Sequence, residues 1–393
     1  MANFFGRIFS KSEKRALGVD IGSSSIKVVE LYTDSGHVYL ETYGSVALGP
    51  YADLEVGKAT GLSVEKIQDA LQKVMQESGC SAEKAAATIP FNASLVSVIR
   101  LPKVSENRLE QIIPIEARKY IPATLEEVVL DWSVIDARPD IPVDNKKVEE
   151  DGNGNESGEK ADKGEEQDKD KKKEKKDDGV AQIDVLLAAI HNDSIERYEK
   201  ILKGTSLEVS FYEIEVFSTL RALSIEENVP VAVIDIGSAS SKVYIIEGGM
   251  MRASHTINRG SQDITIAIAK VMNISEEEAE MVKRAIGAGG SYIHLQEAVQ
   301  NVLDHLFSEA LRFINNYENK NSRAIERVTL SGGGATMKGL QNTAQEFLSK
   351  EVQVAKPFDV VKSLPFMKET LAKIGPEYTP AIGAALRAIG FEK

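Results

Sequence analysis

Apolar and polar positions along the chain follow two periods, and this pattern predicts a mixture of β-strands and α-helices. Short runs that are continuously apolar, or in which every second residue is apolar, are typical of strands. They predict strands at 16–21, 25–31, 37–45, 85–89, 95–101, 127–136, 181–190, 231–236, 241–247, 251–258 and 327–330.

Longer segments repeat their apolar residues every three or four positions, which is typical of amphipathic helices. Because these segments alternate with the predicted strands, the chain is assigned to the α/β class. The predicted helices are 64–78, 106–120, 194–203, 216–225, 263–271, 276–285, 295–318, 337–348 and 381–389.

One sequence motif within this pattern occurs twice in the chain. GVDIGSSSIKVVEL begins at Gly18 and VIDIGSASSKVYII begins at Val233; aligned on Asp20 and Asp235, seven of the first ten positions are identical. Each copy begins a strand–turn–strand unit that is followed by further strands and helices. The sequence therefore predicts a duplicated α/β fold.

Residues 140–178 break the pattern. Of these 39 residues, 25 are Asp, Glu or Lys and none is aromatic. A segment of this composition buries too little apolar surface to offset the entropy lost on ordering, so it is predicted to be disordered. Strand patterns on both sides favour an enlarged hairpin loop over a domain boundary.

The charge and the apolar content of the chain exclude some classes of function. A net charge of −13 argues against a general nucleic-acid binder, and we expect no nucleic-acid partner. No apolar run reaches the ~20 residues that span a bilayer. Residues 1–15 combine Phe4, Phe5 and Phe9 with basic residues, so they are predicted to be a terminal tail or, alternatively, a weak amphipathic contact with an acidic membrane face.

The repeated turn carries the candidate chemistry. An Asp at the end of a buried strand, followed by Gly and serines, directs backbone N–H groups and hydroxyls into one concavity that suits an anion. A carboxylate facing phosphates requires a cation between them, so Asp20 and Asp235 imply Mg²⁺ held partly through water. The alternative is two ordinary hairpins with solvated serines. The predicted cradle residues are Gly22, Ser23, Ser24, Ser25 and Lys27 in the first copy and Gly237, Ser238 and Ser240 in the second.

A glycine-rich turn adds a third candidate element. RVTLSGGGATMKGL, at 327–340, places Gly332, Gly333 and Gly334 between a predicted strand and a predicted helix. Bare backbone there allows close approach to a base or ribose, and a helix N-terminus favours an anion. The alternative is an ordinary strand-to-helix turn.

In this order and spacing, the two hairpins and the glycine-rich turn resemble the actin-like ATPase superfamily, which includes actin, Hsp70-type chaperones, sugar kinases and FtsA. The resemblance implies two related domains that close on Mg-ATP, with Lys27 on a phosphate. It also implies that Glu280 and Lys283, in the segment 279–283, reach the ribose and base, and that residues 379–390 form the last connecting helix.

Within the superfamily, the segments ALGVDIGSSSIKVVEL, ATIP, IEARKYIP, DVLLAAI and GGGATMKGL closely resemble the PilM family of the type IV pilus machine. The resemblance implies a cytoplasmic ATP-binding component at the inner face of the cytoplasmic membrane. Such a component binds the N-terminal cytoplasmic peptide of PilN and links the membrane complex to cytoplasmic motors. It associates with the membrane peripherally, through PilN and other pilus proteins.

The resemblance also implies a domain organisation with an extra subdomain that takes the PilN peptide. The pattern of its helix brings Leu109, Ile112, Ile113 and Ile115 near one another as apolar surface; the alternative is that this surface packs on the subdomain's own sheet. The expected parts are a tail (1–15), a first actin-like domain (16–90 and 209–230, with the helix 379–390), the inserted subdomain (91–208, with the insert 140–178) and a second actin-like domain (231–378).

Two questions stay open at this stage. Glu215, at the junction of the halves, is a candidate to position a hydrolytic water, but a Glu at a helix start also serves the helix dipole; we expect weak or no ATP hydrolysis. The alternative function is an FtsA-like polymerising cell-division or cytoskeletal ATPase, because the fold alone does not distinguish a filament former from an adaptor. A sugar kinase needs a second carboxylate beside a polar pocket, and no such motif is found.

Overall fold

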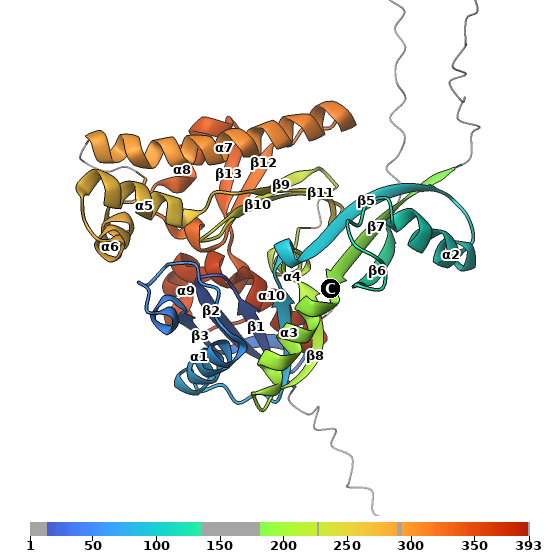
Figure 1. The fold of residues 1–393 in the computed structure, drawn as a ribbon, viewed down its shortest axis with the longest axis horizontal. Helices are drawn as coiled ribbons and strands as arrows, with labels where there is room; N and C mark the ends of the chain where they lie inside the picture. Colours follow the sequence, from blue (N-terminus) through green and yellow to red (C-terminus); the bar gives the residue numbers. More distant parts are fainter. Residues whose placement is uncertain (1–13, 136–180, 226–227, 289–292, 392–393) are drawn as a thin grey trace, which may run out of the picture.

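The computed structural model describes residues 14–135, 181–225, 228–288 and 293–391. The predicted insert 140–178 and all but the last two residues of the predicted tail lie outside these ranges. Within them, two five-stranded sheets and one three-stranded sheet form the framework (Figure 1). The mixed sheets and helices confirm the predicted α/β, actin-like class.

The two five-stranded sheets have the same strand order. In each, the first three strands are antiparallel neighbours, and two parallel strands continue the sheet beyond the first strand. The duplication seen in the two turn sequences therefore extends to both sheets. The first sheet has the order β3 (His37–Ala47), β2 (Ser25–Asp34), β1 (Arg15–Ile21), β4 (Lys84–Ile89), β8 (Glu208–Ile214); the second has β11 (Met250–Ile257), β10 (Ser241–Glu247), β9 (Val231–Ile236), β12 (Arg327–Ser331), β13 (Glu351–Val354).

Helices cover the first sheet on both faces. On one face, Ile67 and Leu71 of α1 (Val64–Glu77) join a core with Tyr198 and Ile201 of α3 (Asn192–Lys203). On the other face, α10 (Thr379–Ala388) packs against β1 and β2. The sequence analysis assigned α3 to the inserted subdomain. Because its apolar side chains lie in the core of the first sheet, we propose that the subdomain ends at β7, described below, rather than at residue 208.

Four helices cover one face of the second sheet, seen in the upper part of Figure 1. Its opposite face carries Val233, Tyr244 and Ile246, which pack against α4 and the three-stranded sheet. The central strands β9 and β10 of this sheet are therefore buried on both sides, as their continuous apolar runs predict. The four covering helices are α5 (Ser261–Met272), α6 (Glu276–Ile286), α7 (Ile293–Asn321) and α8 (Leu340–Leu348), whereas α4 (Glu215–Leu223) lies on the opposite face.

The three-stranded sheet has the order β5 (Ser94–Pro102), β7 (Gln182–His191), β6 (Val128–Ile135) and carries α2 (Glu106–Ala117). β6 and β7 pair antiparallel, as expected for the two sides of one hairpin that holds the insert. The expected apolar surface on α2 is only partly present. Leu109 and Ile113 are buried in the subdomain core, whereas Ile115 is 62% exposed.

The sequence pattern missed β8, β13 and α9 (Lys368–Ile374). Both missed strands are the outermost parallel strand of their sheet, and both carry polar residues at positions that face solvent. The predicted helix 337–348 begins later, at Leu340, because a 3-10 turn at Gly333–Thr336 comes first.

Close contact between α10 and α4 depends on a glycine. A Cβ on Gly383 would overlap the backbone carbonyl oxygen of Ser218, whereas a Cβ on Gly61 would meet open space. We therefore expect Gly383→Ala to lower the free energy of unfolding by about 2 kcal/mol, because backbone does not yield to overpacking. Gly61→Ala, the control, should change it by less than about 0.5 kcal/mol. Urea denaturation measures both; equal values would contradict this account of the helix contact.

Candidate functional site

A cleft of about 510 Å³ lies between the two halves of the molecule. Both repeated turns, the glycine-rich turn and the start of α4 contribute to its wall. The cleft thus brings together every site residue that the sequence analysis singled out. These are Asp20, Gly22, Ser23, Ser24, Ser25, Lys27, Glu215, Asp235, Gly237, Ser238, Ser240, Glu280, Lys283, Gly332, Gly333 and Gly334.

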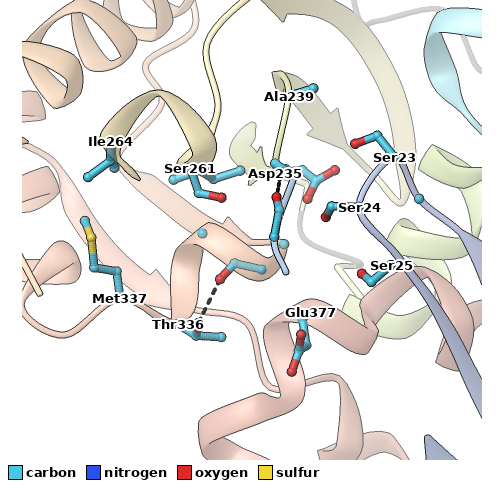
Figure 2. Close-up of a pocket in the computed structure, with 18 of the residues that line it drawn as sticks. Ser23, Ser24, Ser25, Asp235, Ala239, Ser261, Ile264, Thr336, Met337 and Glu377 are labelled. Atoms are coloured by element: carbon cyan, nitrogen blue, oxygen red, sulfur yellow. Dashed lines mark hydrogen bonds between the residues drawn. The ribbon is translucent and has the colours of Figure 1, made fainter. Parts of the chain in front are cut away.

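The two repeated turns are closed in the same way. The Gly22 backbone N–H donates to the Ser25 carbonyl at 3.0 Å, and the Gly237 N–H donates to the Ser240 carbonyl at 3.1 Å. Among the described residues, the N–H groups of Ser23, Ser24, Ser238 and Ala239 have no acceptor. Figure 2 shows the first turn across the cleft from Asp235 and Ala239. This arrangement fits an anion cradle on each side.

Some predicted donors are already engaged. The Lys27 ammonium donates to the Ser25 hydroxyl at 2.7 Å, and the Ser238 hydroxyl donates to the Gly57 carbonyl at 2.9 Å. A serine hydroxyl carries one proton. At Ser238, therefore, the backbone N–H rather than the hydroxyl is available to a ligand in this conformation.

Charged side chains are buried at the base of the cleft. Asp20 stands opposite Lys27 in the first hairpin, and Asp235 stands opposite Lys242 in the second. The Lys242 ammonium lies 3.0 Å from a Glu215 carboxylate oxygen and 3.8 Å from Asp235. The sequence analysis missed Lys242, although it follows Asp235 by the same interval that separates Lys27 from Asp20.

Burial and like charge perturb these carboxyl groups. Burial raises the pKa of Asp20; Lys27 opposes the rise and the nearby Glu215 charge adds to it. Burial also raises the pKa of Asp235, to about 6, against the opposing effect of Lys242. Burial alone would lower the pKa of Lys242, but its carboxylate neighbours outweigh burial and raise it, so Lys242 stays charged.

Glu215 is the first residue of α4 and is largely buried. One of its carboxylate oxygens accepts a hydrogen bond from the Phe91 backbone N–H at 2.8 Å and also faces Lys242. The Glu215 side chain therefore holds neighbouring groups in place by a hydrogen bond and an ion pair, in addition to lining the cleft. Both the catalytic prediction and its helix-dipole alternative stay predictions.

Glu280 and Lys283 lie at the other end of the cleft and bind each other, 2.6 Å apart. Thr265 donates to Glu280 at 2.7 Å and accepts from Lys283 at 2.9 Å. Burial would raise the pKa of Glu280, but Lys283, Thr265 and Arg284 together outweigh burial and lower it. Burial lowers the pKa of Lys283 in spite of Glu280. A ligand that contacts either side chain has to rearrange this pair.

The glycine-rich turn is shaped by close packing. Gly332 has a φ of +82°, and a Cβ on it would overlap the Asp235 carboxylate. Gly333 has room beside Glu377, so its backbone borders the open cleft. Ile264 and Met337 lie at this end of the cleft (Figure 2). No sequence signal distinguished these two apolar residues from core residues.

Comparisons place the chain among known proteins. The family model described as "Type IV pilus assembly protein PilM" matches residues 18–148 and 171–389. A solved "PilM-PilN type IV pilus biogenesis complex" contains a chain that is 24% identical, with a TM-score of 0.73 over 95% of this chain and 98% of that one. The unmatched residues between the two segments fall inside the predicted insert.

Cell division protein FtsA is similar over shorter or weaker alignments. The Bacillus subtilis (strain 168) protein is 28% identical over 155 residues, which is 34% of this chain and 35% of that protein. The Pseudomonas aeruginosa (strain PAO1) protein is 23% identical over 380 residues, 89% of this chain and 85% of that protein. The chain spans about a third to a half of the length of the first curated relatives it matches. In the described part of the chain, no helix has the length and apolar character of a membrane span.

Asp235 should make stability depend on pH. Its pKa in the folded chain is about 6, above the ordinary value of 3.8, so the ionised form is disfavoured by folding. The wild type should therefore lose stability as pH rises from about 4 to 6, by up to ~3 kcal/mol from this group. Asp235→Asn cannot ionise at this position and should lack this loss. Its free energy of unfolding should therefore rise relative to that of the wild type over the same pH interval. Urea denaturation at pH 4.5 and pH 7 tests this; a difference between the two proteins that is the same at both values would contradict it.

Proposed function

Because this chain belongs to the PilM family of type IV pilus assembly proteins, we propose that it binds ATP with Mg²⁺ in the cleft and serves as a platform for PilN at the cytoplasmic face of the inner membrane. The observation that carries the nucleotide proposal is the pair of Asp-Ile-Gly-Ser turns facing each other across the cleft. Two anion cradles on opposite walls suit a chain of phosphates, because each can neutralise a different part of it.

The rest of the cleft accommodates a nucleoside. Phosphates would meet the free N–H groups of the two turns and the Lys27 ammonium. The base and ribose would lie towards Ile264 and Met337, beside the bare backbone of Gly333. Glu280 and Lys283 would contact them after exchanging their mutual bond for ligand bonds. Adenine itself is proposed from the family resemblance.

The carboxylates fit a hydrated Mg²⁺ ion. Asp20, Glu215 and Asp235 face two ammonium groups, those of Lys27 and Lys242, so the cluster has one negative charge in excess. Mg²⁺ is usually bound by one or two carboxylates together with waters and phosphates. Asp20 and Asp235 would hold the ion, which would neutralise phosphate charge when bound.

We also propose that hydrolysis is weak or absent. A catalytic base has to reach the water that it activates. One of the two Glu215 carboxylate oxygens is already shared by the Phe91 N–H and Lys242. This engagement favours a structural role for the nucleotide, which would stabilise one arrangement of the halves.

The proposed PilN-binding surface is the free edge of the three-stranded sheet, formed by β6. β6 is an edge strand, so its outer backbone groups are available to an added strand. Val129 and Val134 on β6 are 52% and 43% exposed, and Ile115 and Tyr120 project from the neighbouring α2 segment. An extended peptide with apolar side chains fits this edge. The proposal places the protein at the membrane through PilN and through contacts with other pilus proteins, including motors.

An FtsA-like filament former is the second candidate. It is supported by the alignment with Pseudomonas aeruginosa FtsA over most of both chains. The fold does not decide between the two. Sedimentation in the presence of ATP distinguishes them, because only the second candidate requires long polymers.

Mg-ATP should stabilise the wild-type protein against thermal unfolding. At about 100 times its dissociation constant, a ligand adds ~2.7 kcal/mol to the free energy of unfolding. Asp20→Ala and Asp235→Ala should each abolish the increase in melting temperature. The control is Asp193→Ala, at a polar helix start away from the cleft. A wild-type melt indifferent to Mg-ATP would refute nucleotide binding.

A synthetic peptide matching the N-terminus of the cognate PilN should bind one-to-one with micromolar-range affinity. Val129→Glu with Val134→Glu should abolish binding in calorimetry, because burying a charge against an apolar peptide is costly. The control is Met281→Glu, which alters another exposed apolar residue, on α6. All variants should keep the thermal response to Mg-ATP. Filaments in the pellet together with no peptide binding would favour the FtsA-like function.

A further inference from the structure

A short segment between β3 and α1 crosses the cleft from the first half to the second. The Gly57 carbonyl accepts the Ser238 hydroxyl at 2.9 Å, and the Ala59 N–H donates to the Gln262 side chain at 3.2 Å. The Lys58 ammonium lies 3.2 Å from Glu276. Ser238, Gln262 and Glu276 belong to the second repeated turn, α5 and α6, so the segment contacts three elements of the far half.

The same segment is anchored to the first repeated turn. The Thr60 N–H donates to the Ser23 carbonyl at 2.8 Å, and the Leu48 N–H, at the end of β3, donates to the Ser24 carbonyl at 2.9 Å. Val56 and Gly57 line the cleft itself. The segment therefore touches both anion cradles and lies against the space that a ligand would fill.

We propose that residues 55–60 form a strap that is a further part of the ligand site, and that its closure across the cleft limits how fast a bound nucleotide is released. This inference rests on the nucleotide binding proposed above. The two anion cradles do not need this segment to keep their shape, because each is closed by hydrogen bonds within its own hairpin.

The contacts suit a part that opens and closes. They are few and polar, and the Lys58–Glu276 pair is partly exposed, so each contact contributes little to stability. Val56 is 45% exposed and packs in no core cluster, so little apolar burial holds the strap down. Segments with few buried contacts open locally at low cost. Opening also releases the Ser238 hydroxyl, which has a single proton to donate.

Charge reversal with its compensating swap tests the strap. The release of a fluorescent ATP analogue is followed by stopped-flow displacement with excess ATP. Lys58→Glu places like charges together and should raise the release rate about threefold. Lys58→Glu with Glu276→Lys should restore the wild-type rate. Lys73→Glu, an exposed lysine on α1, is the matched control and should leave the rate unchanged. A Lys58→Glu rate equal to that of wild type, or a swap that restores nothing, would overturn the proposal.

Hydrogen exchange without nucleotide separates the strap from nucleotide binding. The Ala59 amide is bonded across the cleft and the Thr60 amide to the first turn. Lys58→Glu should speed exchange at Ala59 about threefold, and the swap should reverse this. If wild-type protein binds no nucleotide analogue but Ala59 responds in this way, the strap stands as a contact while the proposed ligand is wrong. If the analogue binds but Ala59 exchanges equally in all variants, the strap is wrong.

Discussion

The pairing of buried carboxylates with two lysines at the base of the cleft is the constraint on which the rest of the structure depends. Each hairpin sets one Asp directly opposite one Lys, and Glu215 from α4 joins the two pairs. Burying charge is costly unless it is compensated, and here three acids meet two ammonium groups. The excess negative charge suits the Mg²⁺ ion proposed above, and burial, opposed by Lys242, raises the pKa of Asp235 to about 6.

Duplication explains how one chain builds this cluster from two sides. Thr88 on β4 lies beside Asp20 and donates to it at 2.6 Å, and Ser331 on β12 is the register neighbour of Asp235. Beyond these two strands the copies diverge. After β12 the chain makes the glycine-rich turn that borders the cleft, whereas after β4 it enters the three-stranded sheet. One copy thus adds the nucleoside end of the proposed ligand site, and the other adds the proposed partner surface.

The sequence predicted what depends on local patterns. Asp20, Asp235 and their turns were found because a buried strand, a glycine and serines are contiguous in each copy. β8 and β13 were missed because outermost strands keep polar residues such as Glu208 and Gln353, which weaken the apolar pattern. Contacts across the cleft, such as Lys58 with Glu276, depend on how the halves close, and no local pattern encodes that. Lys242 could have been predicted from the sequence, because the repeat aligns it with Lys27.

The cleft and the three-stranded sheet are joined by packing rather than by a movable element. Phe91 follows β4, bonds Glu215 through its N–H, and stacks edge-on against Tyr244 with ring centroids 5.6 Å apart. Leu186 of β7 belongs to the same core as Tyr244. Coupling between two sites requires an element that both can shift between alternative states. The proposed strap is such an element, but none of its residues belongs to this core. Ligand binding should therefore close the cleft while leaving the proposed partner surface nearly unchanged. A protein that acts as a platform needs such a constant surface for its partner.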